Sequence, residues 1–448
     1  MPKVVILAYH YPPIGGGGVQ RTLKFSRYLP DLGWETSVVT GLGRPDDRWA
    51  PPDPSMAMEI PDEVTVVRLA TPDPPGQGTV ERLVDRGLAR PSSMERHWIS
   101  GARTIGRPVA AQADVIVGEL VPYSTAVAAV ALSRELGIPW VADLQDPWAL
   151  DEMWIYPSAL HRAVDRRRMR RLLATSSAIV MNTPEAARRI RTVFPDLSAR
   201  VVEAIPNGYD AADFADPPPP RDAAVFRIAH TGYLHTDTGL RHREIRGIRK
   251  VLGGMPLQGV DFLSRSHVFL LQAVDEMIRL DPSLASIIEI HLAGVMTESD
   301  RRISRLAKAR VVEHGYVSHR RSIELIRSAD LLFLPMHDLP GGARAGLVPG
   351  KTYEYLASGT PILAAVPQGD ARDLLLEAGT ALVCEPTDVL AMVSRIRERM
   401  RAWNDGTAPQ PARREIIGRY ERHALTVQFA AVLERAAGSS RLNRPTRG

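Results

Sequence analysis

The chain has 448 residues, of which 44% are hydrophobic, and it carries a formal net charge of +5 at pH 7. This length exceeds what one hydrophobic core usually organises, so two domains are expected. The single cysteine, Cys384, excludes disulfide bonds within the chain and a cysteine-rich metal site. No apolar run approaches the roughly 20 residues of a membrane span, and no signal peptide precedes the first predicted strand, so we predict a cytoplasmic protein.

The first half of the sequence alternates apolar strands with helices, as α/β proteins with parallel sheets do. Strands are expected at Lys3–Ala8, Glu35–Thr40, Val64–Leu69, Asp114–Gly118, Ile138–Leu144, Ala178–Asn182 and Val201–Ile205. Residues 41–80 are rich in proline, aspartate and glycine and are predicted to form an irregular insertion around the third of these strands. We therefore expect a first domain at residues 1–206, followed by a proline-rich linker at residues 207–222.

A glycine-rich loop that begins at His10 separates the first strand from the first helix. Glycines such as Gly16 and Gly17 let the backbone approach a ligand at the carboxyl edge of a parallel sheet. Arg21, in the first turn of the following helix, is predicted to clamp an anion. The loop matches neither the dinucleotide fingerprint, whose third glycine is replaced by Arg21, nor a P-loop. Polyglycine by itself is also compatible with a mobile loop.

Two aspartates, Asp143 and Asp146, follow the fifth strand at the same sheet edge. Their spacing would allow a metal site, but no third ligand is evident. We favour the alternative that both carboxylates cap the following segment and accept hydrogen bonds from backbone N–H groups.

The second half repeats the alternation of strands and helices. Strands are expected at Phe226–His230, Ile287–Leu292, Arg310–Val317, Asp330–Pro335, Pro361–Val366 and Ala381–Cys384. An additional loop is predicted at residues 247–264. The second domain should span residues 223–410, followed by an amphipathic helix at residues 411–436 and a disordered tail at residues 437–448.

One compact segment of this half combines a turn at Gly350, a helix from Lys351 to Ser358 and a strand. The N-terminus of a helix carries unpaired N–H groups and can bind an anion, to which Lys351 adds a cation. Glu354 lies one turn further along the same face and could accept hydrogen bonds from a diol. A nucleotide site is one interpretation, and a solvated Lys351–Glu354 ion pair is the other.

These motifs, in this order, resemble glycosyltransferase family 4, whose members are retaining enzymes that use nucleotide-activated sugars and have the GT-B fold. The resemblance covers nearly the whole chain and rests on the glycine loop with Pro12–Pro13, Asp143–Trp148, Ile205–Asp210, Gly232, Gly315–Val317, Ala329–Pro335 and Pro349–Pro361. It implies two Rossmann-like domains that face each other across a cleft, with the acceptor mainly on the first and the donor on the second. The last helix would cross back to the first domain.

The resemblance also implies roles for individual residues. Glu354 would hold the donor ribose, and Gly315, Tyr316 and Val317 would contact the nucleobase. The donor diphosphate would be bound by Gly16, Gly17, Lys351 and an arginine, next to the donor-side loops at Gly232 and Gly350. Candidate acceptor-side residues are His10, Arg21, Tyr123 and Asp146. Helix dipoles, backbone amides and basic side chains would stabilise the leaving diphosphate, so neither a metal nor another cofactor is expected.

The sequence departs from the family pattern at three places. Gly346 replaces the glutamate expected eight residues before Glu354. The usual arginine and lysine after the first strand of the second domain are missing as a pair, and the arginines that could replace them are Arg241, ranked first, Arg243 and Arg265. The histidine expected near Tyr123 is absent, and His10 or His235 are its candidate substitutes.

The expected function is transfer of a sugar, with retention, from a nucleotide sugar to a hydroxyl acceptor. The alternatives are a nucleotide-sugar epimerase, a phosphorylase, or a non-catalytic scaffold that binds sugar nucleotides. Nucleic-acid binding is not expected, because the basic residues lack interleaved aromatics. The arginine-rich helix at residues 162–171 suggests contact with an anionic membrane, and the acceptor could be a lipid-linked glycan or a small molecule.

Overall fold

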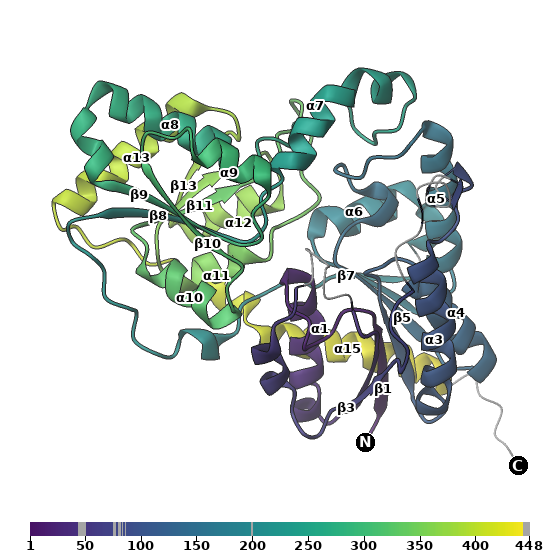
Figure 1. Ribbon diagram of the computed structural model, residues 1–448. Coiled ribbons are helices and arrows are strands. Elements are labelled where there is room, and N and C mark those ends of the chain that lie inside the picture. Colours follow the sequence, from purple (N-terminus) through teal and green to yellow (C-terminus); the bar gives the residue numbers. More distant parts are fainter. Residues whose placement is uncertain are drawn as a thin grey trace, which may run out of the picture. The chain divides into compact units, whose positions relative to one another are not determined.

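The computed structural model describes residues 1–43, 51–74, 78, 82, 84–85, 87–198 and 200–441, with backbone alone for residues 245–246, 248–250 and 439–441. The described chain divides into two compact α/β units (Figure 1). The first contains residues 1–207, 252–256 and the C-terminal segment from Arg422, and the second contains residues 208–251 and 257–421. Parts of the predicted insertion, residues 44–50, 75–77 and 79–80, lie outside the described residues.

The first unit is built on a parallel seven-stranded sheet in the order β3-β2-β1-β4-β5-β6-β7. Its strands are β1 (Lys3–Ala8), β2 (Glu35–Thr40), β3 (Thr65–Arg68), β4 (Val115–Glu119), β5 (Trp140–Leu144), β6 (Ala178–Met181) and β7 (Val201–Ala204). The helices of this unit are α1 (Gly17–Tyr28), α3 (Ser93–Ala110), α4 (Thr125–Leu136), α5 (Ala159–Leu173), α6 (Pro184–Val193) and α15 (Arg422–Arg441). All seven predicted strands are confirmed within two residues at each end.

Alternate residues of β1 pack into two different cores, because successive side chains of a strand point to opposite faces of the sheet. Val5 and Leu7 join the core formed with α3, α4, α5 and α6. Val4 and Ile6 join the core formed with α1 and α15. The sheet is therefore covered on both faces, which explains why its strands are nearly continuous apolar runs.

Helix α3 was not predicted from the sequence. A capping box starts this helix, since the Ser92 side chain accepts from the Glu95 N–H while the Glu95 carboxylate accepts from the Ser92 N–H. Pro108 lies inside the helix and normally argues against one. Trp98 on α3 is fully buried, so packing against the sheet outweighs the local cost of this proline.

The second unit has a parallel six-stranded sheet in the order β10-β9-β8-β11-β12-β13. Its strands are β8 (Phe226–Thr231), β9 (Ile288–Ala293), β10 (Arg310–Gly315), β11 (Leu331–Pro335), β12 (Ile362–Ala365) and β13 (Ala381–Cys384), all at predicted places. Its helices are α7 (Thr236–Val251), α8 (Val268–Leu280), α9 (Glu298–Ser304), α10 (His319–Ser328), α11 (Lys351–Ser358), α12 (Asp370–Ala378), α13 (Val389–Asn404) and α14 (Arg414–Ile417). Both sheets have the doubly wound strand order. The chain first adds strands on one side of the first strand and then returns to add strands on its other side.

Three expectations about segments need correction. The first residues of the loop predicted at residues 247–264 are helical, because α7 extends to Val251. The predicted linker at residues 207–222 groups with the second unit from Gly208 onward. The chain after residue 411 forms two helices, α14 and α15, instead of one.

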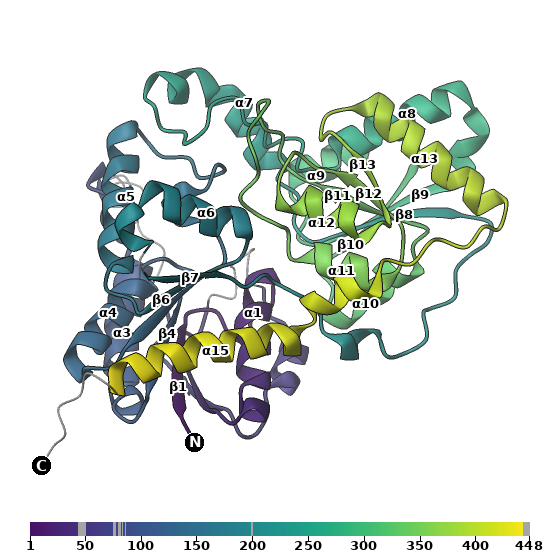
Figure 2. The same ribbon diagram turned by 180° about the vertical axis from the view of Figure 1, so that it is seen from behind.

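Helix α15 packs on the first unit, where the Phe429 ring stacks on Phe25 of α1 with 4.4 Å between ring centroids. Figure 2 shows this helix in yellow, extended along one face of the first sheet. It includes residues 437–441, which the sequence analysis had assigned to a disordered tail. The remainder of that predicted tail, residues 442–448, lies outside the described residues.

Candidate functional site

Each sheet has a topological switch point. It lies between two adjacent strands from which the strand order proceeds toward opposite edges of the sheet. These points lie between β1 and β4 in the first unit and between β8 and β11 in the second. Ligands of doubly wound folds bind outside the carboxyl ends of the strands at such points. Most of the predicted site residues fall at these two edges.

At the second switch point, the side-chain nitrogen of Lys351 lies at the end of β8. Lys351 begins α11, and its Nζ lies 3.3 Å from Nε2 of His230. A neighbouring side chain of α11, Tyr355, accepts the backbone N–H of Thr231 through its hydroxyl at 2.9 Å. Burial and, to a lesser extent, the charge of Arg265 lower the pKa of Lys351 to about 7, while the charge of Glu354 opposes them. The cation predicted from sequence thus lies at the sheet edge.

Gly232 is required where it stands. Its φ is +101°, in the region that L side chains rarely adopt, and an added Cβ would lie 2.8 Å from Nζ of Lys351. Gly294 approaches equally closely from β9, since its Cβ would lie 2.4 Å from the Gly232 carbonyl oxygen. Gly232 therefore makes room for the Lys351 side chain, and Gly294 makes room for the backbone of Gly232.

Arg265, and not the first-ranked Arg241, is the arginine whose charge acts on Lys351. Arg241 is exposed on α7. Arg243, also considered, pairs with Asp261 at 2.6 Å. The position of Arg241 soon after β8 in the sequence favoured it as the phosphate ligand. In the folded chain, Arg265, which follows α7 and the next loop, is the arginine near Lys351.

Glu354 lies one turn into α11 and is mostly buried, with its side chain 17% exposed. Its Oε1 lies 3.8 Å from Nδ1 of His319, and Nε2 of His319 lies 3.0 Å from Oδ2 of Asp213. No Lys351–Glu354 ion pair is recorded among the described residues, so the interpretation as a solvated pair is wrong. The sequence analysis missed His319 and Asp213, which no local motif singles out.

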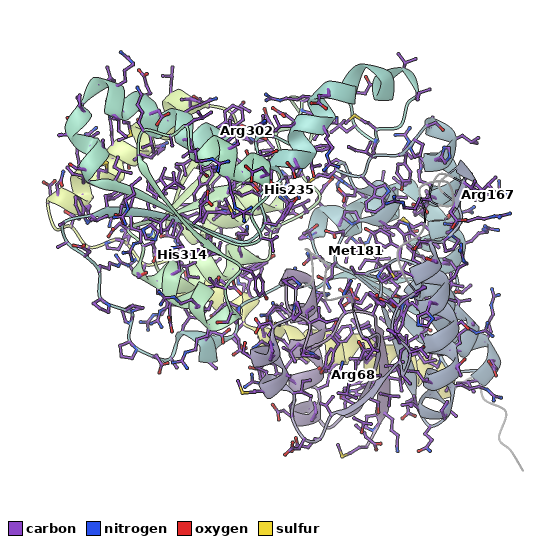
Figure 3. The ribbon with its side chains drawn as sticks, viewed as in Figure 1. Arg68, Arg167, Met181, His235, Arg302 and His314 are labelled. Carbon is purple, nitrogen blue, oxygen red and sulfur yellow. The ribbon has the colours of Figure 1, made fainter. Side chains whose placement is uncertain are left out.

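The loop at Gly315–Val317 follows β10. Gly315 has a φ of +66°, and Tyr316 is 40% exposed. The residue before the loop, His314, is labelled in Figure 3, and its Nε2 lies 3.0 Å from Nδ1 of His291 on β9. Gly350 has an ordinary helical φ of −54°, so its backbone does not require glycine.

At the first switch point, the glycine loop leads into α1, which begins at Gly17 with Gly16 as its N-cap residue. Among the described residues no side chain caps this N-terminus, which leaves N–H groups at the start of α1 that could donate to an anion. Gly16 has a φ of +96°, a conformation that favours glycine.

Arg21 does not clamp a ligand, contrary to the prediction. It is fully buried, and its Nη2 lies 2.7 Å from Oδ1 of Asp143. Its Nη1 donates to the carbonyl oxygens of Ile205 and Pro206. Burying a guanidinium requires a paired carboxylate, so Arg21 and Asp143 tie α1, β5 and the end of β7 together. Asp143 is thereby paired with Arg21 instead of capping the following segment.

Glu119 is a buried acid that the sequence analysis missed. It ends β4, and its Oε1 accepts from Nε2 of Gln145 at 3.0 Å. Burial raises its pKa well above the ordinary value, and the charge of Asp143 raises it further. Gln145 also donates to the Gly18 carbonyl at 2.6 Å and so links this acid to the glycine loop.

An aromatic cluster follows β4 and β5 at the same edge. Tyr123 stacks on Trp148 at 4.8 Å between ring centroids, and Trp154 meets Tyr123 edge-on at 5.9 Å. Trp154 is 45% exposed, and Asp146 nearby is exposed as well. Trp148 has a φ of +52°, unusual for a bulky residue, and its indole N–H donates to Asp165. His10 contacts Tyr9 edge-on and is partly buried at the end of β1.

A basic groove of about 620 Å³ lies between α5 and the segment after α6. Three exposed arginines line it, Arg166, Arg167 and Arg170, together with Asp196. Arg167 points away from the body of this unit (Figure 3). In the described part of the chain, no helix is long and apolar enough to cross a membrane, and no cluster of side chains suited to a metal ion was found.

Comparison with solved structures defines the class of fold. An α,α-trehalose 6-phosphate synthase from Burkholderia multivorans superimposes with a TM-score of 0.58 at 15% identity, covering 100% of this chain and 99% of that one. HepE from Anabaena, solved in complex with UDP and glucose, gives a TM-score of 0.57 at 16% identity, covering 97% and 100%. Two doubly wound units with these relatives constitute the GT-B fold.

Sequence comparison then gives the family. A model described as a glycosyl transferase 4-like domain matches residues 16–208, and one described as glycosyl transferases group 1 matches residues 262–401. The chain belongs to the group 1 glycosyltransferases, a family 4-like class of enzymes. A D-inositol 3-phosphate glycosyltransferase from Xylanimonas cellulosilytica is 27% identical over 229 residues, which are 49% of this chain and 48% of that protein. The match thus spans about half the length of this curated relative.

Proposed function

We propose that this chain transfers a sugar, with retention of anomeric configuration, from a nucleotide-sugar donor to a hydroxyl group of an acceptor. The observation that carries the proposal is the first turn of α11, where Lys351 and Glu354 lie at the second switch point with Arg265 close by. Cations and a carboxylate are the groups that a diphosphate and a ribose diol require. The structure of HepE in complex with UDP and glucose supports a nucleotide sugar as the class of donor.

In this proposal, Lys351 and Arg265 of the second unit bind the donor diphosphate. The N–H groups at the start of α1, around Gly16 and Gly17, are proposed as phosphate ligands of the first unit. Glu354 accepts hydrogen bonds from the ribose hydroxyls. Gly315, Tyr316 and Val317 contact the base. Arg265 takes the role first given to Arg241, because its charge acts on Lys351.

The chemistry breaks the bond between the anomeric carbon and the diphosphate oxygen and forms one to the acceptor oxygen on the same face of the sugar. The acceptor proton passes to the departing phosphate oxygen, so no protein nucleophile is needed. Fixed cations and helix N-termini stabilise the charge that develops on the diphosphate. We propose that neither a metal nor another cofactor takes part.

The acceptor is proposed to bind at the first switch point, beside Trp154, Tyr123, Asp146 and His10. An exposed indole edge can stack on a sugar ring or an aromatic group, and the exposed carboxylate can accept hydroxyl hydrogen bonds. Both a lipid-linked glycan and a small cyclic alcohol fit this chemistry.

Peripheral contact with an anionic membrane at the cytoplasmic face is proposed through the basic groove. Neutralising Arg166, Arg167 and Arg170 to glutamine should abolish co-sedimentation with phosphatidylglycerol vesicles in low salt. The matched control is the triple glutamine variant of Arg301, Arg302 and Arg305, which are exposed on or just after α9 of the other unit. Vesicle binding that both triple variants retain, or that salt does not weaken, would remove this partner.

The decisive experiment measures nucleotide release from UDP-, GDP-, ADP- and dTDP-sugars without acceptor, with and without divalent metal. Slow release from one donor in the absence of metal is expected, and Glu354→Ala should raise the donor KM strongly. Wild-type kinetics in that variant would refute the nucleotide assignment. Acceptor-independent conversion of the donor would instead reveal an epimerase, and binding without turnover a scaffold.

A further inference from the structure

The tautomer of His230 is fixed by its surroundings. His230 is 2% exposed, and its Nδ1 lies 2.9 Å from the carbonyl oxygen of Phe333 on β11. A carbonyl oxygen can only accept, so Nδ1 carries the hydrogen. In a neutral imidazole Nε2 then presents a lone pair, and this atom faces Nζ of Lys351 at 3.3 Å. The lysine must therefore donate to the histidine.

Burial, assisted by nearby positive charges, favours the neutral forms of both His230 and Lys351. Burial lowers the pKa of His230 well below its ordinary value, and Lys351, His267 and Arg265 lower it further. Burial and Arg265 lower the pKa of Lys351, and only Glu354 opposes them. Among the described residues, His230 is the one hydrogen-bond partner recorded for the Lys351 side chain.

A neutral acceptor has a consequence that a carboxylate would not have. A carboxylate at 3.3 Å would hold the lysine charged and would compete with an incoming phosphate for it. A neutral imidazole instead orients the Lys351 amine without stabilising its charged form. The protonation state of Lys351 then depends on whether an anionic ligand is bound. Gly232 has no Cβ, and an added one would lie 2.8 Å from Nζ, so this glycine lets the amine lie against the backbone at the end of β8.

We propose that His230 is a positioning residue for Lys351, and that the Lys351 amine takes up a proton when the donor diphosphate binds. The inference rests on the proposed function, since it requires a diphosphate at this site. The ammonium would keep one N–H bond to His230 and direct its other two toward phosphate oxygens. The proton comes from solvent and is released again when the nucleoside diphosphate leaves.

Proton uptake can be measured directly by calorimetric titration with UDP, or with the diphosphate that the donor screen selects, in two buffers of different ionisation enthalpy. At pH 8 the wild type should take up roughly one proton more than Lys351→Arg, whose guanidinium is always charged. At pH 6 the two proteins should not differ. Equal uptake at pH 8 would overturn the proposal.

Two substitutions of His230 separate positioning from structural support. His230→Asn can still donate to the Phe333 carbonyl, because its amide nitrogen replaces Nδ1, but it loses the acceptor for Lys351. His230→Gln reaches the position of Nε2 and offers an oxygen to Lys351, but gives up the bond to Phe333. We expect the asparagine variant to raise the donor KM roughly ten-fold and the glutamine variant to restore most of the affinity.

Equal losses in both variants, accompanied by equal decreases in melting temperature, would assign His230 a purely structural role and overturn the inference. Different results would contradict the proposed function and the role of His230. If no nucleoside diphosphate binds the wild type, the proposed function fails. If one binds without proton uptake, only the inference fails.

Discussion

Glu354 and His319 lie on neighbouring helices, α11 and α10, with 3.8 Å between Oε1 and Nδ1, and Asp213 contacts the far nitrogen of the same imidazole at 3.0 Å. The imidazole lies between these two carboxylates and limits where the Glu354 side chain can move. His319→Ala should therefore raise the donor KM about five- to ten-fold and change kcat less. Steady-state kinetics would show this.

The control for that experiment lies on the same helix. Arg320 is exposed, and Arg320→Ala should leave the donor KM unchanged. Asp213→Asn should give a smaller effect than loss of the imidazole. An unaltered donor KM in His319→Ala would show that Glu354 needs no such support.

The buried pair of Arg21 and Asp143 predicts a large loss of stability from a single substitution. Arg21→Met leaves Asp143 without its partner in the core and should cost about 3–5 kcal/mol of unfolding free energy. Urea unfolding followed by tryptophan fluorescence suits the measurement, because Trp34, Trp98 and Trp140 are all buried in this unit.

Substituting both members of the pair provides the control. Arg21→Met combined with Asp143→Leu should recover much of the stability, because no charge then remains uncompensated. A loss below about 1 kcal/mol in the single variant, together with weaker diphosphate binding, would restore the original idea of an anion clamp.

Glu119 should make stability decrease with rising pH. Its pKa is raised in the folded protein, so above the ordinary value of 4.5 the unfolded chain ionises while the folded chain holds its proton. Stability present at low pH is therefore lost as pH rises toward the folded pKa. Glu119→Gln should stabilise the protein relative to wild type more at pH 8 than at pH 5, by up to about 1.4 kcal/mol per pH unit.

Thermal melts across this pH range would measure the difference. The matched control is Glu203→Gln, since Glu203 is partly exposed in a surface pair with Arg435. A difference between Glu119→Gln and wild type that does not vary with pH would contradict the buried, protonated acid.

Gly232 predicts a local effect on the donor site. Gly232→Ala would place a Cβ against Nζ of Lys351 and force an unfavourable φ, so the lysine must move. Donor affinity should decrease about ten-fold in a titration. The control is Gly247→Ala on α7, whose added Cβ would meet nothing within 4 Å and which should bind the donor normally. Normal donor binding by both variants would show that Lys351 does not contact the donor.

Trp154 predicts a selective effect on the acceptor. Trp154→Ala removes the exposed indole of the aromatic cluster and should raise the acceptor KM about ten-fold while the donor KM is unchanged, with Trp154→Phe intermediate. Leu160→Ala is the control, because Leu160 is 71% exposed outside this cluster. An unchanged acceptor KM in the alanine variant would place the acceptor elsewhere.

The sequence by itself determined both sheets, the glycine loop and the first turn of α11. Apolar runs and their glycine and proline boundaries are local signals, and the spacing of Lys351 and Glu354 places them on one helical face whatever surrounds them. Helix α3 was the main element that was not predicted. Pro108 argues locally against a helix, and the burial of this segment depends on residues distant in the sequence.

Only the tertiary structure decided which residues meet. His230 and Lys351 are 121 positions apart, and Arg21 and Asp143 are 122 apart, so no local pattern could pair them. The buried Arg21 had the same residue type and the same helix position as an anion clamp, and its burial beside Asp143 excluded that role. Long-range packing fixed the desolvation and charge around each group, and these quantities determine its chemistry.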